Sequence, residues 1–257
     1  MISLEAAPIV GLLLSVTRVS GFVVASPLFP RSIPMIGRMA VVLTLGFFLA
    51  EPVPGAEDLA TLINAAVVNA AIGVALGFLT GMIFHLFAVA GALVDFSSGA
   101  STGAIFDPSF GESAAIFQRM FSMGAMVLFY VLGGLRLIAQ GLALSVEVIA
   151  LDGAITPDGS LATVAIRLLS RLVAAGLEIA LPSLAALFLI EVVFGVASRF
   201  APQANIFMLG LPAKLLAAFG TVTVVILLFP EAMDAVIATM TDTFRDGIAG
   251  LAAAPGA

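Results

Sequence analysis

One segment of the sequence has the pattern of a hydrolytic nucleophile. Gly99-Ala-Ser101-Thr-Gly103 matches G-x-S-x-G, in which a serine attacks an acyl carbon after a nearby base takes its proton. The only histidine, His85, precedes this serine, whereas the hydrolases with this motif and the intramembrane serine proteases place the histidine downstream. The chain has no cysteine and no tight carboxylate cluster, so a local metal site or acid–base pair cannot form. We therefore predict a protein that is not an enzyme and has no metal site or cofactor.

Several ionisable residues lie within or at the edges of long apolar runs. Each would cost roughly 2.5–3.5 kcal/mol at the centre of a bilayer. They must therefore form pairs, line a wet cavity, lie near an interface, or pack against other subunits. These residues are Arg18, Arg119, Arg136, Glu147, Arg167, Arg171, Glu178, Glu191 and Lys214.

Arg167, Arg171 and Glu178 are offset by four and seven residues, so they share one helix face. Two interpretations stay open for this stripe. The arginines can extend to a membrane interface because they lie near the start of their apolar run. Alternatively, the stripe is a buried contact with another subunit.

Glu191 lies deeper in its run, and the nearest downstream basic residue, Arg199, is eight positions away. It therefore needs a partner from elsewhere, and a proton relay is an alternative role for such an acid. We predict that Glu191 and Lys214 join the stripe as subunit-contact charges.

The elements that carry these residues are apolar throughout. The chain is 61% hydrophobic and 10% charged, whereas soluble domains have about 25% charged residues. This composition predicts an all-α integral membrane protein with a single membrane domain over residues 1–257 and about six hydrophobic segments, arranged as helical hairpins with broken helices. Runs long enough to be helices in a membrane cover roughly 8–28, 35–50, 59–94, 114–151, 161–198 and 206–229.

Two of these runs exceed one crossing, so 59–94 and 114–151 can each be one long tilted helix or a hairpin. In the second run, Gly133-Gly134 offers a break. Gly73, Gly77 and Gly81 recur every four residues in the first run, which predicts a face where another helix packs closely.

The distribution of charge constrains partners and orientation. The formal net charge is -6 and no basic stripe exists, which excludes nucleic acid as a partner. Arg31 and Arg38 mark one connector and Arg199 and Lys214 another. Because basic residues favour the cytoplasmic side, both termini are expected outside.

The connector Asp95–Ser113 is polar and rich in small residues, yet it carries several apolar side chains. Its glycines permit bends, Asp107-Pro108 favours a turn, and Ser113 can cap the next helix. If Phe106 and Phe110 are exposed, we expect another protein surface to cover them. An ordinary re-entrant connector is the alternative.

In this loop and in two other segments the sequence resembles the FliR family of flagellar and type III secretion export-gate proteins, which includes the SctT-like proteins of injectisomes. The resemblance spans about 8–230, leaving a short tail over 231–257, and it departs from the family pattern at Pro30 and at Asp95-Phe96. The matching segments are Ala104-Ile-Phe106-Asp107-Pro108; Ser26-Pro27-Leu-Phe29 with Ile33-Pro34 and Arg38; and Ala201-Pro202-Gln203-Ala-Asn205-Ile-Phe207 with Gly210-Leu-Pro212-Ala-Lys214.

This resemblance implies a core subunit of the flagellar export gate in the bacterial inner membrane, within the flagellar basal body. Its partners would be FliP-like and FliQ-like subunits, an FlhB-like subunit, membrane lipid and the unfolded proteins that pass through. We favour the flagellar system over an injectisome because nothing appended to the chain suggests specialisation. By the same resemblance the loop would plug the pore through Ile105, Phe106, Asp107, Pro108, Phe110 and Gly111. The alternative function is a secondary transporter or ion channel for a small solute, suggested by Glu191, the charged stripe and the broken helices.

Overall fold

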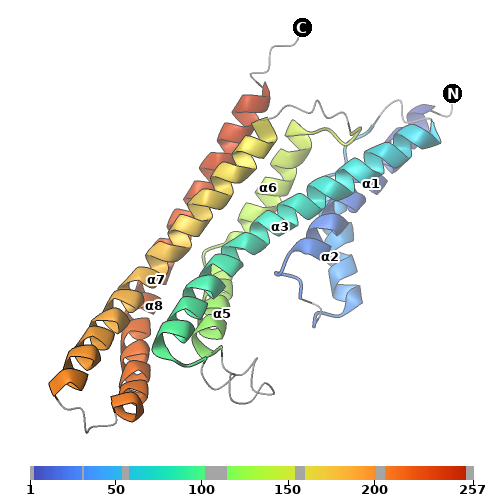
Figure 1. Ribbon diagram of the computed structural model, residues 1–257. Helices are drawn as coiled ribbons and strands as arrows, with labels where there is room; N and C mark the ends of the chain where they lie inside the picture. Colours follow the sequence, from blue (N-terminus) through green and yellow to red (C-terminus); the bar gives the residue numbers. More distant parts are fainter. Residues whose placement is uncertain are drawn as a thin grey trace. The chain divides into compact units, whose positions relative to one another are not determined.

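The computed structural model describes residues 3–30, 32–53, 58–101, 115–153, 160–200 and 206–252. Every regular element within these ranges is a helix (Figure 1), which confirms the all-α class. The helices are α1 (Ser3–Ala25), α2 (Met35–Phe48), α3 (Leu59–Ser98), α5 (Ile116–Val131), α6 (Gly134–Val148), α7 (Ser160–Phe200) and α8 (Ile206–Ala252).

Among the described residues, four helices are long and apolar enough to cross a membrane: Ala7–Ala25, Leu59–Ser98, Val173–Phe200 and Leu209–Ala238. The interrupted pair α5 and α6 adds a fifth span if its halves cross together. By contrast, α2 has 14 residues and is about 21 Å long, which is shorter than the hydrocarbon core of about 30 Å. The protein is therefore an all-helical membrane protein.

The two overlong runs have different structures. The first is one continuous helix, because α3 extends over 40 residues without a break. The second is divided between α5 and α6 at Gly133, which has φ 79°. Only a residue without Cβ adopts this left-handed backbone conformation at little cost. Glycine at this position therefore ends one helix and lets the next begin.

The end of the last apolar run differs from the sequence prediction. We expected the run to end at 229 with a tail after it, but α8 continues through Pro230 to Ala252. A proline inside a helix removes one backbone hydrogen bond, and the helix-forming residues after Pro230 support the remaining turns. Residues 231–252 are therefore part of a helix.

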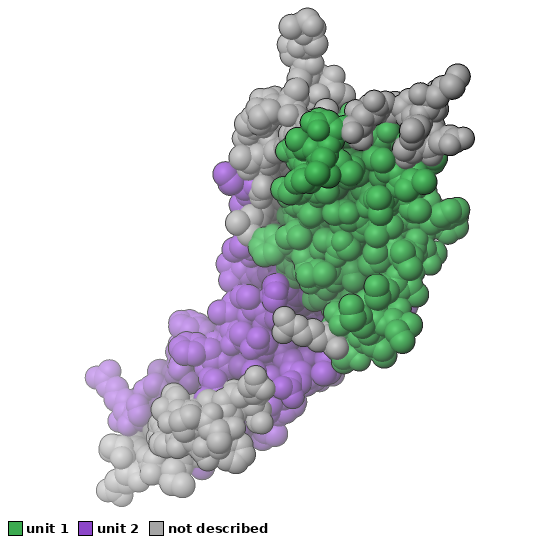
Figure 2. Space-filling view, turned by 90° about the vertical axis from the view of Figure 1, so that its right-hand side faces the viewer, with its two compact units in different colours: residues 1–82, 132–163, 244–257 green, residues 83–131, 164–243 purple. Residues whose placement is uncertain are grey.

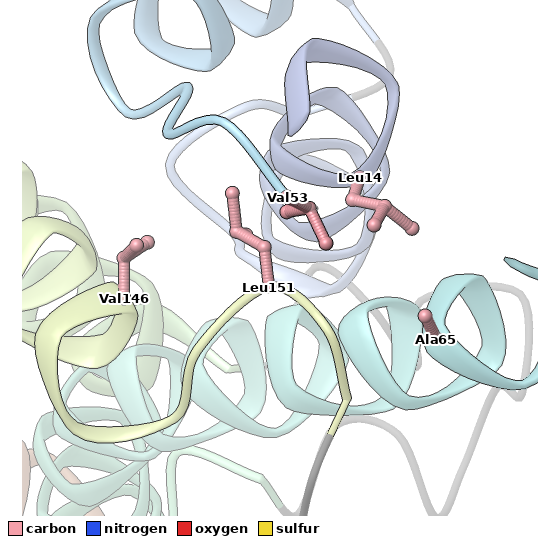
Figure 3. Close-up of a cluster of buried hydrophobic side chains, with 5 residues drawn as sticks. All are labelled: Leu14, Val53, Ala65, Val146 and Leu151. Carbon is pink, nitrogen blue, oxygen red and sulfur yellow. The ribbon is translucent and has the colours of Figure 1, made fainter. Parts of the chain in front are cut away.

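The chain forms two compact units, coloured separately in Figure 2. Unit 1 comprises residues 1–82, 132–163 and 244–257, and unit 2 comprises 83–131 and 164–243. In unit 1, one buried cluster joins α1, α3, α6 and the adjoining segments (Figure 3). It consists of Leu14, Val53, Ala65, Val146 and Leu151.

Unit 2 has an aromatic core. Phe229 of α8 meets Phe87 of α3 with ring centroids 5.0 Å apart and Phe121 of α5 at 4.9 Å, both edge-on. Edge-to-face geometry at this separation is the favoured one for aromatic pairs. These rings hold α8 against α3 and α5.

The helices α7 and α8 run antiparallel (Figure 1) and are much less covered than α1 and α3. Within the chain, 17% of the span window of each is buried, against 50% for α3. Most of their apolar surface therefore faces lipid or another protein.

Candidate functional site

Among the described residues, the most completely buried charge is Arg18 in α1, which is 0% exposed. Its guanidinium group donates three short hydrogen bonds across unit 1. Nε donates to Oδ1 of Asn69 at 2.8 Å, Nη1 to the carbonyl oxygen of Ser145 at 2.6 Å, and Nη2 to that of Ile149 at 2.8 Å. Thus α1 is fastened to α3 and to the end of α6.

The end of α6 attracts the cation for a general reason. The last carbonyl groups of a helix have no intrahelical partner, and they form the negative end of its dipole. Asn69 completes the network, since its Nδ2 donates to the carbonyls of Ala65 at 2.7 Å and Leu151 at 2.8 Å. Sequence reasoning identified Arg18 as needing a partner but missed Asn69. The available signal was an amide side chain four residues before Gly73 in a mostly apolar run.

Three of the glycines of α3, those that recur every four residues, lie against α1 and the turn after it. A Cβ on Gly73 would lie 1.9 Å from the carbonyl oxygen of Arg18, and one on Gly77 would lie 2.6 Å from that of Phe22. A Cβ on Gly81 would meet a Pro27 side-chain carbon at 3.2 Å. The contact tolerates no side chain at the first two positions.

The motif residues of the first connector lie where α1 turns into α2. The ring of Phe29 packs edge-on against Phe22, with centroids 6.4 Å apart, and Pro34 precedes the first residue of α2. Arg38 lies in the first turns of α2, and its buried Nε has no hydrogen-bond partner within the described part of the chain.

Asp95, near the end of α3, is 3% exposed and caps the start of α5. Its Oδ1 accepts from the backbone N–H of Phe117 at 3.0 Å and its Oδ2 from that of Gln118 at 2.8 Å. A carboxylate at this place satisfies free N–H groups and complements the positive end of the helix dipole. Asp95 therefore holds the two helices together on either side of the connector, although its role was not recognised in the sequence.

The predicted plug residues lie outside the described part of the chain, as does Ser113. The plug residues are Ile105, Phe106, Asp107, Pro108, Phe110 and Gly111.

Glu191 finds its partner on the neighbouring helix. Nζ of Lys214 in α8 lies 2.6 Å from Oε1 of Glu191 in α7. The side chain of Glu191 remains 63% exposed, whereas that of Lys214 is 22% exposed. The pair joins α7 to α8 and leaves most of the carboxylate at the surface.

Glu178 lines a cavity of about 570 Å³ between α7 and α8, together with Glu231 and mainly apolar residues. Arg167 and Arg171 lie within α7, but their side chains fall outside the described part, so the predicted stripe is not placed as a unit.

The third family motif lies partly outside the described residues. Pro202, Gln203 and Asn205 lie outside the described residues, and the side chain of Phe207 does as well. Pro212 lies exposed within the first turns of α8.

The serine pattern has no catalytic geometry in the described residues. Ser101 lies in the turn after α3, and its N–H donates to the carbonyl oxygen of Asp95 at 3.4 Å. No hydrogen bond joins it to His85 among the residues that are described. The same residues contain no group of three or more histidine, aspartate and glutamate side chains that could hold a metal ion.

Comparison with known proteins gives a consistent result. Residues 9–240 match the family described as Bacterial export proteins, family 1. The chain is 27% identical to the flagellar biosynthetic protein FliR of Bacillus subtilis (strain 168), over 80% of this chain and 82% of that protein. It is also 27% identical to the FliR of Escherichia coli (strain K12), over 77% of each chain. A further relative is the surface presentation of antigens protein SpaR of Shigella flexneri, which is 29% identical over 57% of this chain and 56% of its own length.

Proposed function

Because the chain belongs to family 1 of the bacterial export proteins, we propose that it is a core membrane subunit of a type III protein export gate. The observation that carries this proposal is the extent of the family match, which begins in α1 and ends within α8. The relatives with the most extensive coverage are flagellar biosynthetic proteins. We therefore place the chain in the flagellar export gate, in the bacterial inner membrane at the basal body.

Its exposed charges support a role as one subunit among several. Glu178, Glu191 and Glu231 are all exposed on α7 and α8, within the apolar spans. Carboxylates at such positions are costly against hydrocarbon and are stable when other helices or water cover them. We propose that FliP-like and FliQ-like subunits supply the covering helices, with an FlhB-like subunit also in contact.

The loop between α3 and α5 is our candidate for the pore plug, with Phe106 and Phe110 as its sealing side chains. Packed apolar side chains can exclude water from a narrow pore, and flexible glycines allow such a plug to move aside. The contact of Asp95 with the first turn of α5 would anchor the loop at its base.

The alternative function, a secondary transporter or ion channel, has less support than the export-gate role. It depended partly on Glu191 as an acid without a partner, and this carboxylate pairs with Lys214.

Deletion of the gene in its native bacterium tests the function. We expect the mutant to lose secretion of flagellar proteins into the medium, and the wild-type gene to restore it. Affinity purification should also recover FliP-like and FliQ-like subunits with the chain. Normal secretion in the deletion mutant, or uptake of a defined solute by liposomes that contain this chain alone, would contradict the proposal.

The plug is tested separately by deleting Ile105–Gly111. The expected result is a faster collapse of the ion gradient across the inner membrane, measured with a potential-sensitive dye. An unchanged leak in a strain whose gate still assembles would refute the plug role and leave the subunit role intact.

A further inference from the structure

The cavity between α7 and α8 has mainly apolar walls, and the polar side chains that line it are hydrogen-bond acceptors. Its volume is about 570 Å³, and its polar side chains are Glu178 of α7 and Glu231 of α8. Of the described residues that line it, none is basic. Neither carboxylate forms an ion pair within the described part of the chain, where the pair recorded is Glu191 with Lys214.

A proline adds a third acceptor at this place. Pro182 lies inside α7 and lines the same cavity. Since proline has no N–H, the carbonyl group four residues earlier, that of Glu178, receives no helical hydrogen bond from it. The cavity is therefore lined by two carboxylate residues and by a turn of α7 in which one carbonyl lacks its usual helical donor.

Such a site is complementary to a group that only donates hydrogen bonds. Ammonium and guanidinium groups have donors and no acceptors, and their aliphatic stems pack well on apolar walls. A divalent cation is a poorer match, because Ca²⁺ takes about six to eight oxygen ligands and the cavity offers two carboxylate side chains.

The small residues around the carboxylates indicate where the donor comes from. Ala174 and Ala175 of α7 and Ala232 of α8 line the cavity, and small residues let the backbone of another membrane helix approach closely. Both helices are otherwise poorly covered.

We infer that this cavity receives a lysine or arginine side chain from a helix of a partner subunit. The inference depends on the proposed function, since it names the contact by which α7 and α8 join the rest of the gate. Charged hydrogen bonds of this kind specify which helix docks and in which register.

The first experiment measures how fast partner subunits leave the purified complex. The tagged chain is isolated in mild detergent with its FliP-like and FliQ-like subunits, and their dissociation is followed after dilution. The double variant Glu178→Gln/Glu231→Gln should dissociate about tenfold faster or more, the factor expected for loss of charged hydrogen bonds.

Asp234→Asn is the matched control. Asp234 lies on the same helix, three residues from Glu231, and it is exposed but does not line the cavity. Its replacement should change the dissociation rate by less than about twofold, as is usual for a surface charge. Circular dichroism of each variant verifies that the helices are formed.

The second experiment identifies the occupant without altering a charge. The chain has no cysteine, so Ala174→Cys creates a unique position for a benzophenone maleimide. After illumination of the complex, we expect a cross-link to a partner peptide that carries lysine or arginine within one helical turn.

The possible outcomes separate the inference from the proposed function. If the wild-type chain brings down no other gate subunit, the proposed function fails. If the subunits are present, the inference fails when the double glutamine variant dissociates like the wild type. It also fails when the cross-link joins lipid, this chain itself, or a peptide without a basic residue.

Discussion

Replacing Arg18 by methionine removes the cation that joins α1, α3 and α6, while an apolar side chain still fills much of the space. The acceptor Oδ1 of Asn69 and the carbonyl oxygen of Ile149 then lose their short bonds to the guanidinium group. The carbonyl of Ser145 keeps a second donor, because the N–H of Ile149 also lies 3.1 Å from it. All three acceptors thus lose their charged donor, and two of them, Asn69 Oδ1 and the carbonyl oxygen of Ile149, keep no other donor among the described residues.

An unsatisfied buried polar group costs about 1–3 kcal/mol, so the variant should lose about 2–6 kcal/mol of stability. The desolvation cost of the buried cation is recovered in the variant, which places the expected value toward the lower end of this range. The chain contains no tryptophan, so unfolding is best followed by circular dichroism in detergent with increasing denaturant.

A local measurement tests the cause as well as the magnitude. Hydrogen exchange should accelerate most in the turn around Ile149 and Leu151, while the first turn of α5 in unit 2 keeps its protection. Asn69→Leu should accelerate exchange in the same turn, and the two substitutions together should be far from additive. If Arg18→Met is as stable as the wild type or more stable, good apolar packing outweighs the network, and the reasoning is wrong.

Three further predictions concern single contacts. Gly73→Ala should displace α1 and lower stability, measured by thermal unfolding, by about 1–3 kcal/mol, whereas Gly141→Ala, which meets nothing within 4 Å, should be neutral or slightly stabilising. Asp95→Ala should cost about 0.5–2 kcal/mol through loss of the cap and accelerate hydrogen exchange in the first turn of α5, and unchanged exchange there would contradict its capping role. Reversing both charges in Glu191→Lys/Lys214→Glu should restore the stability lost in either single variant, but the coupling should be only about 0.2–1 kcal/mol because the pair is largely exposed.

The sequence was sufficient for the helical class, and it identified Gly133-Gly134 as the place where the run 114–151 would break, while one long tilted helix stayed open as the alternative. That break depends on local backbone chemistry, since Gly133 adopts a conformation that other residues avoid. We expected the last apolar run to end at 229, but α8 continues to Ala252, because a run of apolar residues marks the part of a helix that suits a membrane and not the last turn of that helix. Pro230 removes one hydrogen bond, and its position does not reveal whether the following turns have enough contacts to persist.

Local sequence patterns could not identify the partners of the buried charges. Arg18 binds groups 127 and 131 positions away. These acceptors are backbone carbonyls, and every residue has one, so the residue type does not indicate which carbonyl binds the cation. Asp95 likewise binds backbone N–H groups across the connector. A search of the sequence for side chains of opposite charge therefore finds neither contact.

Two groups of charged residues differ in their contacts. One group binds helix ends within the chain, and the other consists of carboxylates that are available for contacts with other subunits. Arg18 binds at the carbonyl end of α6, and Asp95 binds at the N–H end of α5, so each charge meets the helix end of opposite polarity. The Arg18 contact lies within unit 1 and the Asp95 contact within unit 2, so each is internal to this chain and needs no other protein. Glu178 and Glu231 line a cavity between α7 and α8, far from the ends of both helices, and the described residues that line it include no helix end. It follows that docking on α7 and α8 should weaken when these two carboxylates are neutralised, whereas changes at Arg18 and Asp95 should act first on the fold of the chain itself.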